Sequence, residues 1–247
     1  MTNKPVGIIS AIPEEIKYLL DGQAEEVIVG NITFYRGKIE GEQAVFVETG
    51  IGKVNAAIVS TLLVSHFDCR ALMFSGVAGG LDPKLNVGDV VIGERLVQHD
   101  YGKIQEEALQ TFQPGAFPLP GVDSTHGFNM SEELKARSHK LLDEVILESL
   151  PNNETPSHHF GAIVTGDAFI NCEVTRVRLH KDFKAMAVEM EGAAIVQVAE
   201  QMNRPWVVVR CLSDLAGSES HMDFDTFLAA ASINAARVTR KLVHLFG

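Results

Sequence analysis

The chain has 247 residues, of which 46% are apolar and 21% are charged, and its formal net charge is −11. This length and composition favour one globular domain over residues 1–247, because no charged, Pro/Ser-rich or low-complexity block divides the sequence. The acidic balance, without a cluster of Lys or Arg, argues against nucleic acid and anionic membranes as partners.

The amino terminus leads directly into a predicted strand and lacks the h-region of a signal peptide, and no apolar stretch approaches the ~20 residues that span a bilayer. We therefore expect a cytoplasmic protein. The three cysteines, Cys69, Cys172 and Cys211, lack the C-x-x-C spacing of zinc and disulfide sites. We expect them to be core thiols, and we expect no metal and no cofactor.

Two predicted elements open the chain, a strand over residues 6–10 and a helix over residues 11–20. Pro13 suits the first turn of a helix, and Glu14 and Glu15 follow it. Acids in this place complement the helix dipole, so a purely structural role is one explanation. The other is that one carboxylate faces a pocket beyond the strand.

Three alternating segments, 26–29, 33–39 and 43–48, then predict an antiparallel meander, and a helix to about His66 follows the glycine-containing turn at 50–54. The next strand, 71–75, ends in Gly76-Val-Ala-Gly-Gly80. A plain turn needs fewer small residues, so we favour close approach of a ligand to this backbone. The run lacks the spacing of a phosphate-binding loop.

The middle of the chain is the least regular part. A long strand over 89–98 leads into a segment from His99 to about Asn129 with few helical periods, and a helix is expected from Ser131 to about Leu147. Long loops in compact domains are usually lids or partner contacts, or else mobile. Apolar side chains in this one favour contact with something other than water, namely Phe112, Phe117 and Leu119.

Polar or aromatic side chains also follow two later strands. The strand 159–165 leads into Gly166-Asp-Ala-Phe-Ile-Asn171, where Phe169 either packs the loop or stacks on a planar ligand. A second strand ends in Glu189-Met-Glu191, where alternation puts two like charges on one face and indicates a polar partner. A helix over 192–199 follows.

The strand 207–214 delivers Ser213 and Asp214 to its end, and a long amphipathic helix, 224–245, closes the chain. β-Branched Val207 to Val209 suit a strand covered on both faces. Asp214 either caps the next segment or faces a pocket at the edge of the sheet. If the five strand ends converge, they supply carboxylates, an aromatic ring and hydroxyl-binding groups, which suits acid and base catalysis of nucleoside hydrolysis.

Several of these motifs, in this order, resemble bacterial 5'-methylthioadenosine/S-adenosylhomocysteine nucleosidases of the nucleoside phosphorylase superfamily. They are Thr49-Gly-Ile-Gly-Lys-Val54, Gly76-Val-Ala-Gly-Gly-Leu81, Gly166-Asp-Ala-Phe-Ile-Asn171, Val188-Glu-Met-Glu191 and Val208-Val-Arg-Cys-Leu-Ser-Asp214. The resemblance implies a single α/β domain with a central mixed twisted sheet flanked by helices. It also implies an adenine nucleoside as substrate and a homodimer.

The resemblance further implies a role for individual residues. Glu15 would activate the hydrolytic water, and Asp214, held by Ser213, would act as the acid at purine N7. Phe169 would stack on adenine, and the backbone of Ile170 would read its edge. The ribose would contact Met190 and Glu191, with Glu189 a further candidate. Other implied contacts are Ile51 and Phe224 on the 5' side and Val77, Ala78 and Gly79 beneath the sugar and base.

One segment departs from the family pattern. Residues 101–106 are more polar than the apolar segment that the family donates across a dimer interface, which leaves the 5' specificity open between methylthio, homocysteinyl and futalosine-type substrates. Phe112, Phe117 or Pro118 are candidates to replace that segment. Three alternatives therefore remain: an aminodeoxyfutalosine nucleosidase, a purine nucleoside phosphorylase, and a non-catalytic adenosine-binding protein. Two acids in the first turn would repel phosphate, which disfavours phosphorolysis.

Overall fold

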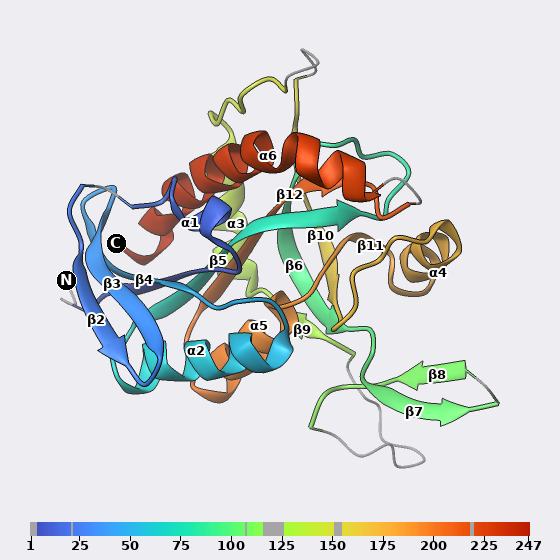
Figure 1. Cartoon of the computed structure of the whole chain (residues 1–247), viewed down its shortest axis with the longest axis horizontal. Coiled ribbons are helices and arrows are strands. Elements are labelled where there is room, and N and C mark those ends of the chain that lie inside the picture. The colour runs from blue at the N-terminus through green and yellow to red at the C-terminus, as the bar shows by residue number, and fades with distance from the viewer. Residues whose placement is uncertain (1–3, 21, 107, 116–125, 151–154, 218–219) are drawn as a thin grey trace.

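The computed structural model describes residues 4–20, 22–106, 108–115, 126–150, 155–217 and 220–247. Its centre is a mixed, twisted sheet with helices on both faces (Figure 1), which confirms the predicted α/β fold class. The strands of this sheet are β1 (Val6–Ser10), β2 (Glu25–Val29), β3 (Ile32–Ile39), β4 (Glu42–Glu48), β5 (Ala71–Gly80), β6 (Val90–Gln98), β9 (Phe128–Asn129), β10 (His158–Thr165), β11 (Ala185–Glu189) and β12 (Trp206–Asp214).

Part of the sheet closes on itself. The strands follow the order β11-β10-β6-β12-β5-β1-β4-β3-β2, and β11 also pairs antiparallel with β5, where Ala187 lies opposite Gly80 and Val188 opposite Gly79. Strands β5, β12, β6, β10 and β11 therefore form a ring. The predicted meander of β2, β3 and β4 is confirmed and extends from this ring through β1.

Strand β12 is the most deeply placed element of the ring. It pairs parallel with β5 and antiparallel with β6, and all nine of its residues are buried. The prediction of a strand covered on both faces, with Ser213 and Asp214 at its end, is confirmed.

Six α-helices and a short 3₁₀ helix accompany the sheet in the described residues. They are α1 (Pro13–Ile16), α2 (Lys53–Ser65), α3 (Glu132–Leu142), α4 (Glu173–Phe183), α5 (Gly192–Gln201), α6 (Ser220–Leu242) and η1 (Val243–Phe246). Helices α1 and α6 lie on one face of the sheet and α2 and α5 on the other (Figure 1). Across the described ranges, none of the helices has the length and apolarity that a membrane span requires.

The segment after β6 is more regular than expected. It contains the hairpin β7 (Gly102–Gln105) and β8 (Ala108–Thr111), which extends away from the body of the molecule (Figure 1). The rings of Tyr101 and Phe112 pack edge to face at its base, with centroids 5.2 Å apart. Local pairing of two short strands gives little periodicity in the sequence, so the prediction of an irregular loop was wrong over 102–105 and 108–111. Phe117, Pro118 and Leu119 lie outside the described residues.

Several smaller expectations differ from the structure. Helix α1 covers Pro13–Ile16 and not residues 11–20. Helix α3 ends at Leu142, five residues before the expected position, and helix α4 was not predicted, because its sequence is polar and only weakly amphipathic. Cys69 and Cys211 are buried, but Cys172 is exposed at the start of α4 and is not a core thiol.

Candidate active site

A cavity of about 340 Å³ lies where the ends of β5, β11 and β12 meet the first turn of the chain and the start of α6. Twelve of the thirteen predicted site residues line it: Glu15, Ile51, Val77, Ala78, Gly79, Phe169, Glu189, Met190, Glu191, Ser213, Asp214 and Phe224. Ile170 lines a small adjoining pocket that shares Phe169, Met190 and Asp214 with the cavity. Four lining residues were not predicted: Ala11, Ile12, Val188 and Asp225.

Size alone does not identify this site. A cavity of about 620 Å³ lies along the second half of α6, but its acidic residues, Glu40 and Glu144, are exposed. The smaller cavity instead contains buried carboxylates, which are costly to desolvate and are retained where other groups compensate them.

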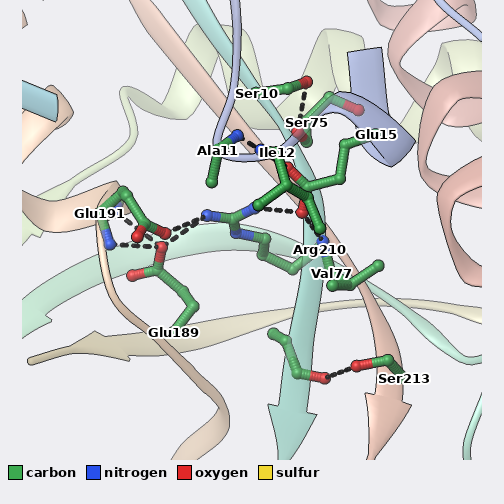
Figure 2. Close-up of polar contacts among 12 residues, drawn as sticks. Ser10, Ala11, Ile12, Glu15, Ser75, Val77, Glu189, Glu191, Arg210 and Ser213 are labelled. Atoms are coloured by element: carbon green, nitrogen blue, oxygen red, sulfur yellow. Dashed lines mark hydrogen bonds and ion pairs between the residues drawn. The ribbon is translucent and has the colours of Figure 1, made fainter. Parts of the chain in front are cut away.

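Glu15 is held by the backbone at the start of α1. Its Oε2 accepts hydrogen bonds from the N–H groups of Ala11 at 2.7 Å and Ile12 at 3.2 Å, and its Oε1 accepts one from Val77 at 2.9 Å (Figure 2). The side chain thus satisfies donors at a helix amino terminus and also reaches across to β5. Burial raises the pKa of Glu15, although nearby Arg210 and the three N–H groups favour the ionised form.

Asp214 lies at the end of β12 and is only 2% exposed. Its Oδ2 accepts a hydrogen bond from the Ser213 hydroxyl at 3.0 Å, and its Oδ1 accepts one from the N–H of Ala216 at 2.8 Å. The second contact closes a local turn, which agrees with the structural alternative that Asp214 caps the segment after the strand. A Cβ on Gly79 would lie 3.1 Å from Oδ1, so the small residue lets the carboxylate lie against β5. Asp214 both stabilises its turn and faces the cavity.

Arg210 is the central residue that the sequence analysis missed. It lies inside β12, is fully buried, and its Nη2 donates to Glu189 Oε2 at 2.7 Å and Glu191 Oε2 at 3.2 Å. Its Nη1 lies 3.8 Å from Glu15 Oε1, and its guanidinium stacks 3.5 Å above the Phe74 ring. Figure 2 shows Arg210 between Glu15 on one side and Glu189 and Glu191 on the other, with Ser213 apart from this group. A lone arginine in an apolar strand was the available signal, because a buried cation needs carboxylate partners.

Glu189 is occupied by contacts within the protein. Besides Arg210, its carboxylate accepts hydrogen bonds from the Thr165 hydroxyl and from the N–H groups of Glu191 at 3.0 Å and Gly192 at 2.7 Å. These contacts leave Glu189 better suited to holding the start of α5 than to binding a ligand.

Glu191 lies at the first turn of α5 rather than on the strand, because β11 ends at Glu189. The prediction that strand alternation aligns the two acids was therefore wrong, although their carboxylates do meet at Arg210. The Glu191 Oε1 accepts a hydrogen bond from the Gly52 N–H at 2.8 Å. Burial, and then the charge of Glu189, raise the pKa of Glu191 to about 8 against the opposing effect of Arg210.

The glycine run at the end of β5 continues the strand instead of forming a turn. A Cβ on Gly76 would lie 2.2 Å from Arg210 Nη1 and 2.3 Å from Glu15 Oε1. At this position the space is used by protein side chains, so the expectation of ligand contact was wrong for Gly76. Gly79 does line the cavity.

Apolar side chains are left exposed at the rim of the cavity. Phe169 is 44% exposed and meets the Phe224 ring edge to face, with centroids 6.3 Å apart. Ile51, on the loop before α2, is 57% exposed. The described lining contains five acids, Glu15, Glu189, Glu191, Asp214 and Asp225, and no Lys or Arg. The site therefore suits a neutral or cationic ligand with an aromatic part and hydroxyl groups.

Comparison with known proteins gives consistent matches over nearly the whole chain. The phosphorylase superfamily model matches residues 5–244. The 5'-methylthioadenosine/S-adenosylhomocysteine nucleosidase of Mycobacterium bovis is 40% identical over 247 residues, which cover 96% of each chain. A crystal structure of the Helicobacter pylori enzyme of that name, in complex with a pyrrolopyrimidine compound, has 28% identity and a TM-score of 0.83 over 99% of this chain and 100% of the other. A native futalosine hydrolase structure from Helicobacter pylori has 28% identity and a TM-score of 0.82 over 98% of each chain.

Proposed function

Since the chain belongs to the phosphorylase superfamily and groups there with the 5'-methylthioadenosine/S-adenosylhomocysteine nucleosidases, we propose that it hydrolyses the N-glycosidic bond of 5'-methylthioadenosine and S-adenosylhomocysteine. The products are adenine and the 5-thio-substituted ribose. The observation that carries the proposal is that Glu15 and Asp214, two of the four buried carboxylates that line one cavity, are held by different elements in different surroundings. Such a pair supplies an acid and a base in one site.

Asp214 acts as the acid. A purine leaves readily only when its imidazole ring is protonated, and Asp214 delivers this proton to N7. The Ser213 hydroxyl and the Ala216 N–H each bind one of the two carboxyl oxygens, and these two contacts orient the proton donor.

Glu15 acts as the base that activates water. Burial raises its pKa, and a base whose pKa lies closer to the working pH removes a proton more effectively. Arg210 Nη1 is buried and makes no hydrogen bond within the described residues, and it lies 3.8 Å from Glu15 Oε1. A water held between these two groups would be oriented for attack on the anomeric carbon.

The other lining residues bind the nucleoside. Phe169 stacks on adenine, and the backbone of Ile170 reads the edge of the base from the adjoining pocket. The ribose lies against Met190 and Glu191, and the cavity floor beneath sugar and base is formed by Val77, Ala78 and Gly79. Ile51 and Phe224 face the 5' substituent. Glu189 contributes indirectly by holding Arg210 and the start of α5.

The test is adenine release from 5'-methylthioadenosine in phosphate-free buffer. Glu15→Gln and Asp214→Asn should each remove turnover while leaving the far-ultraviolet circular dichroism spectrum that of the folded wild type. Glu14→Gln is the matched control, because Glu14 is an exposed neighbour in the same turn. Near-normal rates in either active-site variant would disprove the mechanism, and a strict requirement for phosphate would favour a phosphorylase.

The substrate's 5' group is the part that needs direct comparison. The similarity to a futalosine hydrolase structure keeps aminodeoxyfutalosine as the alternative substrate. Steady-state constants for 5'-methylthioadenosine, S-adenosylhomocysteine and aminodeoxyfutalosine, measured side by side, rank the three. A kcat/KM higher for aminodeoxyfutalosine than for both thio-nucleosides would reverse the assignment.

We also infer a cytoplasmic homodimer. None of the residues 101–106 and 108–115 lines the cavity of their own chain, so the hairpin β7–β8 is available to a second copy. Helices α2 and α4 expose apolar side chains that a partner would cover, namely Val54, Ile58, Val174 and Val177. Sedimentation at assay concentration tests this, since a fully active monomer would contradict it.

A further inference from the structure

Three charged side chains outside the catalytic contacts connect the loops around the cavity. Lys53 Nζ lies 2.5 Å from Asp100 Oδ1 and 3.6 Å from Asp167 Oδ2. The second Asp100 oxygen, Oδ2, accepts a hydrogen bond from the N–H of Asp167 at 2.9 Å, and Asp167 Oδ1 accepts one from the N–H of Lys53 at 2.9 Å. These contacts form a closed set, which we call the rim triad.

Each member of the rim triad comes from a different part of the fold. Lys53 begins α2 and lies two residues after Ile51, whereas Asp167 follows β10 and lies two residues before Phe169. Asp100 follows β6, and its two carboxylate oxygens bind one partner each, Lys53 through Oδ1 and Asp167 through Oδ2. The triad therefore joins the loop that carries Ile51 to the loop that carries Phe169.

The two loops differ in how firmly they are otherwise held. The Phe169 loop rests on β6, because His99 N–H donates to Thr165 O at 2.9 Å and a Cβ on Gly166 would lie 2.3 Å from His99 Nε2. The Ile51 loop is fixed at its start, where the Thr49 N–H donates to Ser10 O at 2.9 Å, and locally by Asn55 Nδ2, which donates to Ile51 O at 2.8 Å. Its contacts with the other loops around the cavity are that of Gly52 with Glu191 and those of the rim triad. Disruption of the rim triad would therefore increase the mobility of the Ile51 loop more than that of the Phe169 loop.

We propose that Asp100 is a positioning residue that fixes the spacing between Ile51 and Phe169, and so sets the affinity for nucleosides that touch both. This inference rests on the proposed nucleosidase function, because that function places adenine at Phe169 and the 5' group at Ile51. A ligand that fills only the base position does not depend on the spacing.

The charges of the triad support this role. The side chain of Lys53 is 16% exposed and that of Asp100 is 30% exposed, so their attraction is less screened than at the open surface. Burial opposes ionisation of Asp100, but the pKa of Asp100 is lowered because Lys53 and the Asp167 N–H outweigh burial. Asp100 is therefore held as a carboxylate that accepts from both loops.

The test uses Asp100→Asn, whose single acceptor oxygen keeps at most one of the two contacts. We expect KM for 5'-methylthioadenosine to rise about tenfold, as for removal of one charge-assisted hydrogen bond, with kcat within about twofold of the wild type. The inhibition constant of adenine should stay within about twofold. Amide hydrogen exchange in residues 49–54 should become about tenfold faster.

Asp68→Asn is the matched control. Asp68 also pairs with two cations, Lys4 and Arg204, but it lies outside the cavity lining. Asp68→Asn should leave the KM for 5'-methylthioadenosine and the amide hydrogen exchange in residues 49–54 unchanged. An unchanged KM in Asp100→Asn, or an equal weakening of adenine and nucleoside, would overturn the proposal.

The two hypotheses fail in different ways. If the wild-type protein releases no adenine from any of the nucleosides tested, the proposed function fails, and the exchange rates still decide whether Asp100 holds the Ile51 loop. Unchanged exchange at 49–54 would overturn the positioning role whatever the activity.

Discussion

The buried arginine offers the sharpest test of the site's electrostatics. Arg210→Met replaces the guanidinium with an apolar side chain and leaves Glu15, Glu189 and Glu191 without their common cation. The guanidinium lies 2.7 Å from the Glu189 carboxylate, 3.2 Å from that of Glu191 and 3.8 Å from that of Glu15. Removing one partner of a buried ion pair costs about 3–5 kcal/mol. This is a large part of the ~5–15 kcal/mol by which a domain is usually stable.

The unfolding free energy that Arg210→Met loses should be larger at high pH than at low pH. Arg210 favours the ionised forms of Glu15 and Glu191, so its removal raises both pKa values further. A carboxyl whose folded pKa is raised contributes stability that is present below its unfolded pKa and is lost as the pH rises. The difference in unfolding free energy between wild type and variant should therefore be larger at pH 9 than at pH 6, by at least ~1 kcal/mol for one further pKa unit.

Urea unfolding followed by circular dichroism at the two pH values measures this difference. Arg178→Met is the control, because the Arg178 side chain is half exposed and lies 3.9 Å from its ion-pair partner Asp182. Its cost should stay below ~1 kcal/mol at both pH values. An equal destabilisation at pH 6 and pH 9 in Arg210→Met would refute the electrostatic reasoning and would assign the cost to packing against Phe74. If Arg210→Met does not fold at pH 9, Arg210→Lys, which retains a cation, should fold there.

Three further variants test other parts of the site. Gly76→Ala places a methyl group 2.2 Å from Arg210 Nη1, and the kcat measured in steady-state assays should fall about 100-fold because the catalytic groups are misplaced. Gly37→Ala is the control, since its nearest contact is at 3.5 Å, and its kcat should be near that of the wild type. The unfolding temperature of the wild type should fall between pH 5 and pH 9, because the pKa of Glu191 is raised from 4.5 to about 8 and the stability that this group contributes at low pH is lost across that window. Glu191→Gln removes this titration, so the unfolding temperature of the variant should fall less over the same range. Phe169→Ala should raise KM about 10- to 100-fold if the ring stacks on adenine, and an unchanged KM would exclude that contact.

Much of the site could be predicted because strand ends leave local signals. An acid after a run of β-branched residues, as at Asp214, and an acid in the first turn of a helix, as at Glu15, both point to the edge of a sheet where ligands bind. The shared cavity of these two residues follows from strand order, which places the first turn next to β5 and β12. Periodicity does not reveal that order, and the family resemblance implied only that the two residues share one site.

Arg210 could not be assigned in the same way, because its role depends on contacts with residues up to 195 positions away in the sequence.

The hairpin β7–β8 was missed for a different reason. Its eight strand residues are almost all exposed, so hydrophobic alternation is absent and only pairing reveals the strands. Glu189 was a candidate for ligand binding, and the sequence does not show how many groups of the protein its carboxylate binds.

The closed ring of strands also determines where the molecule tolerates attachment. Among the described strands of the main sheet, those of the ring have no free edge, whereas β2 at the other end has one unpaired side. Its residues Glu25 and Glu26 carry charge at this edge, and such charges discourage pairing between copies. Tags or fusions placed next to β2 would therefore extend the molecule away from the cavity, because β2 lies at the far end of the strand order from β12, which carries Ser213 and Asp214.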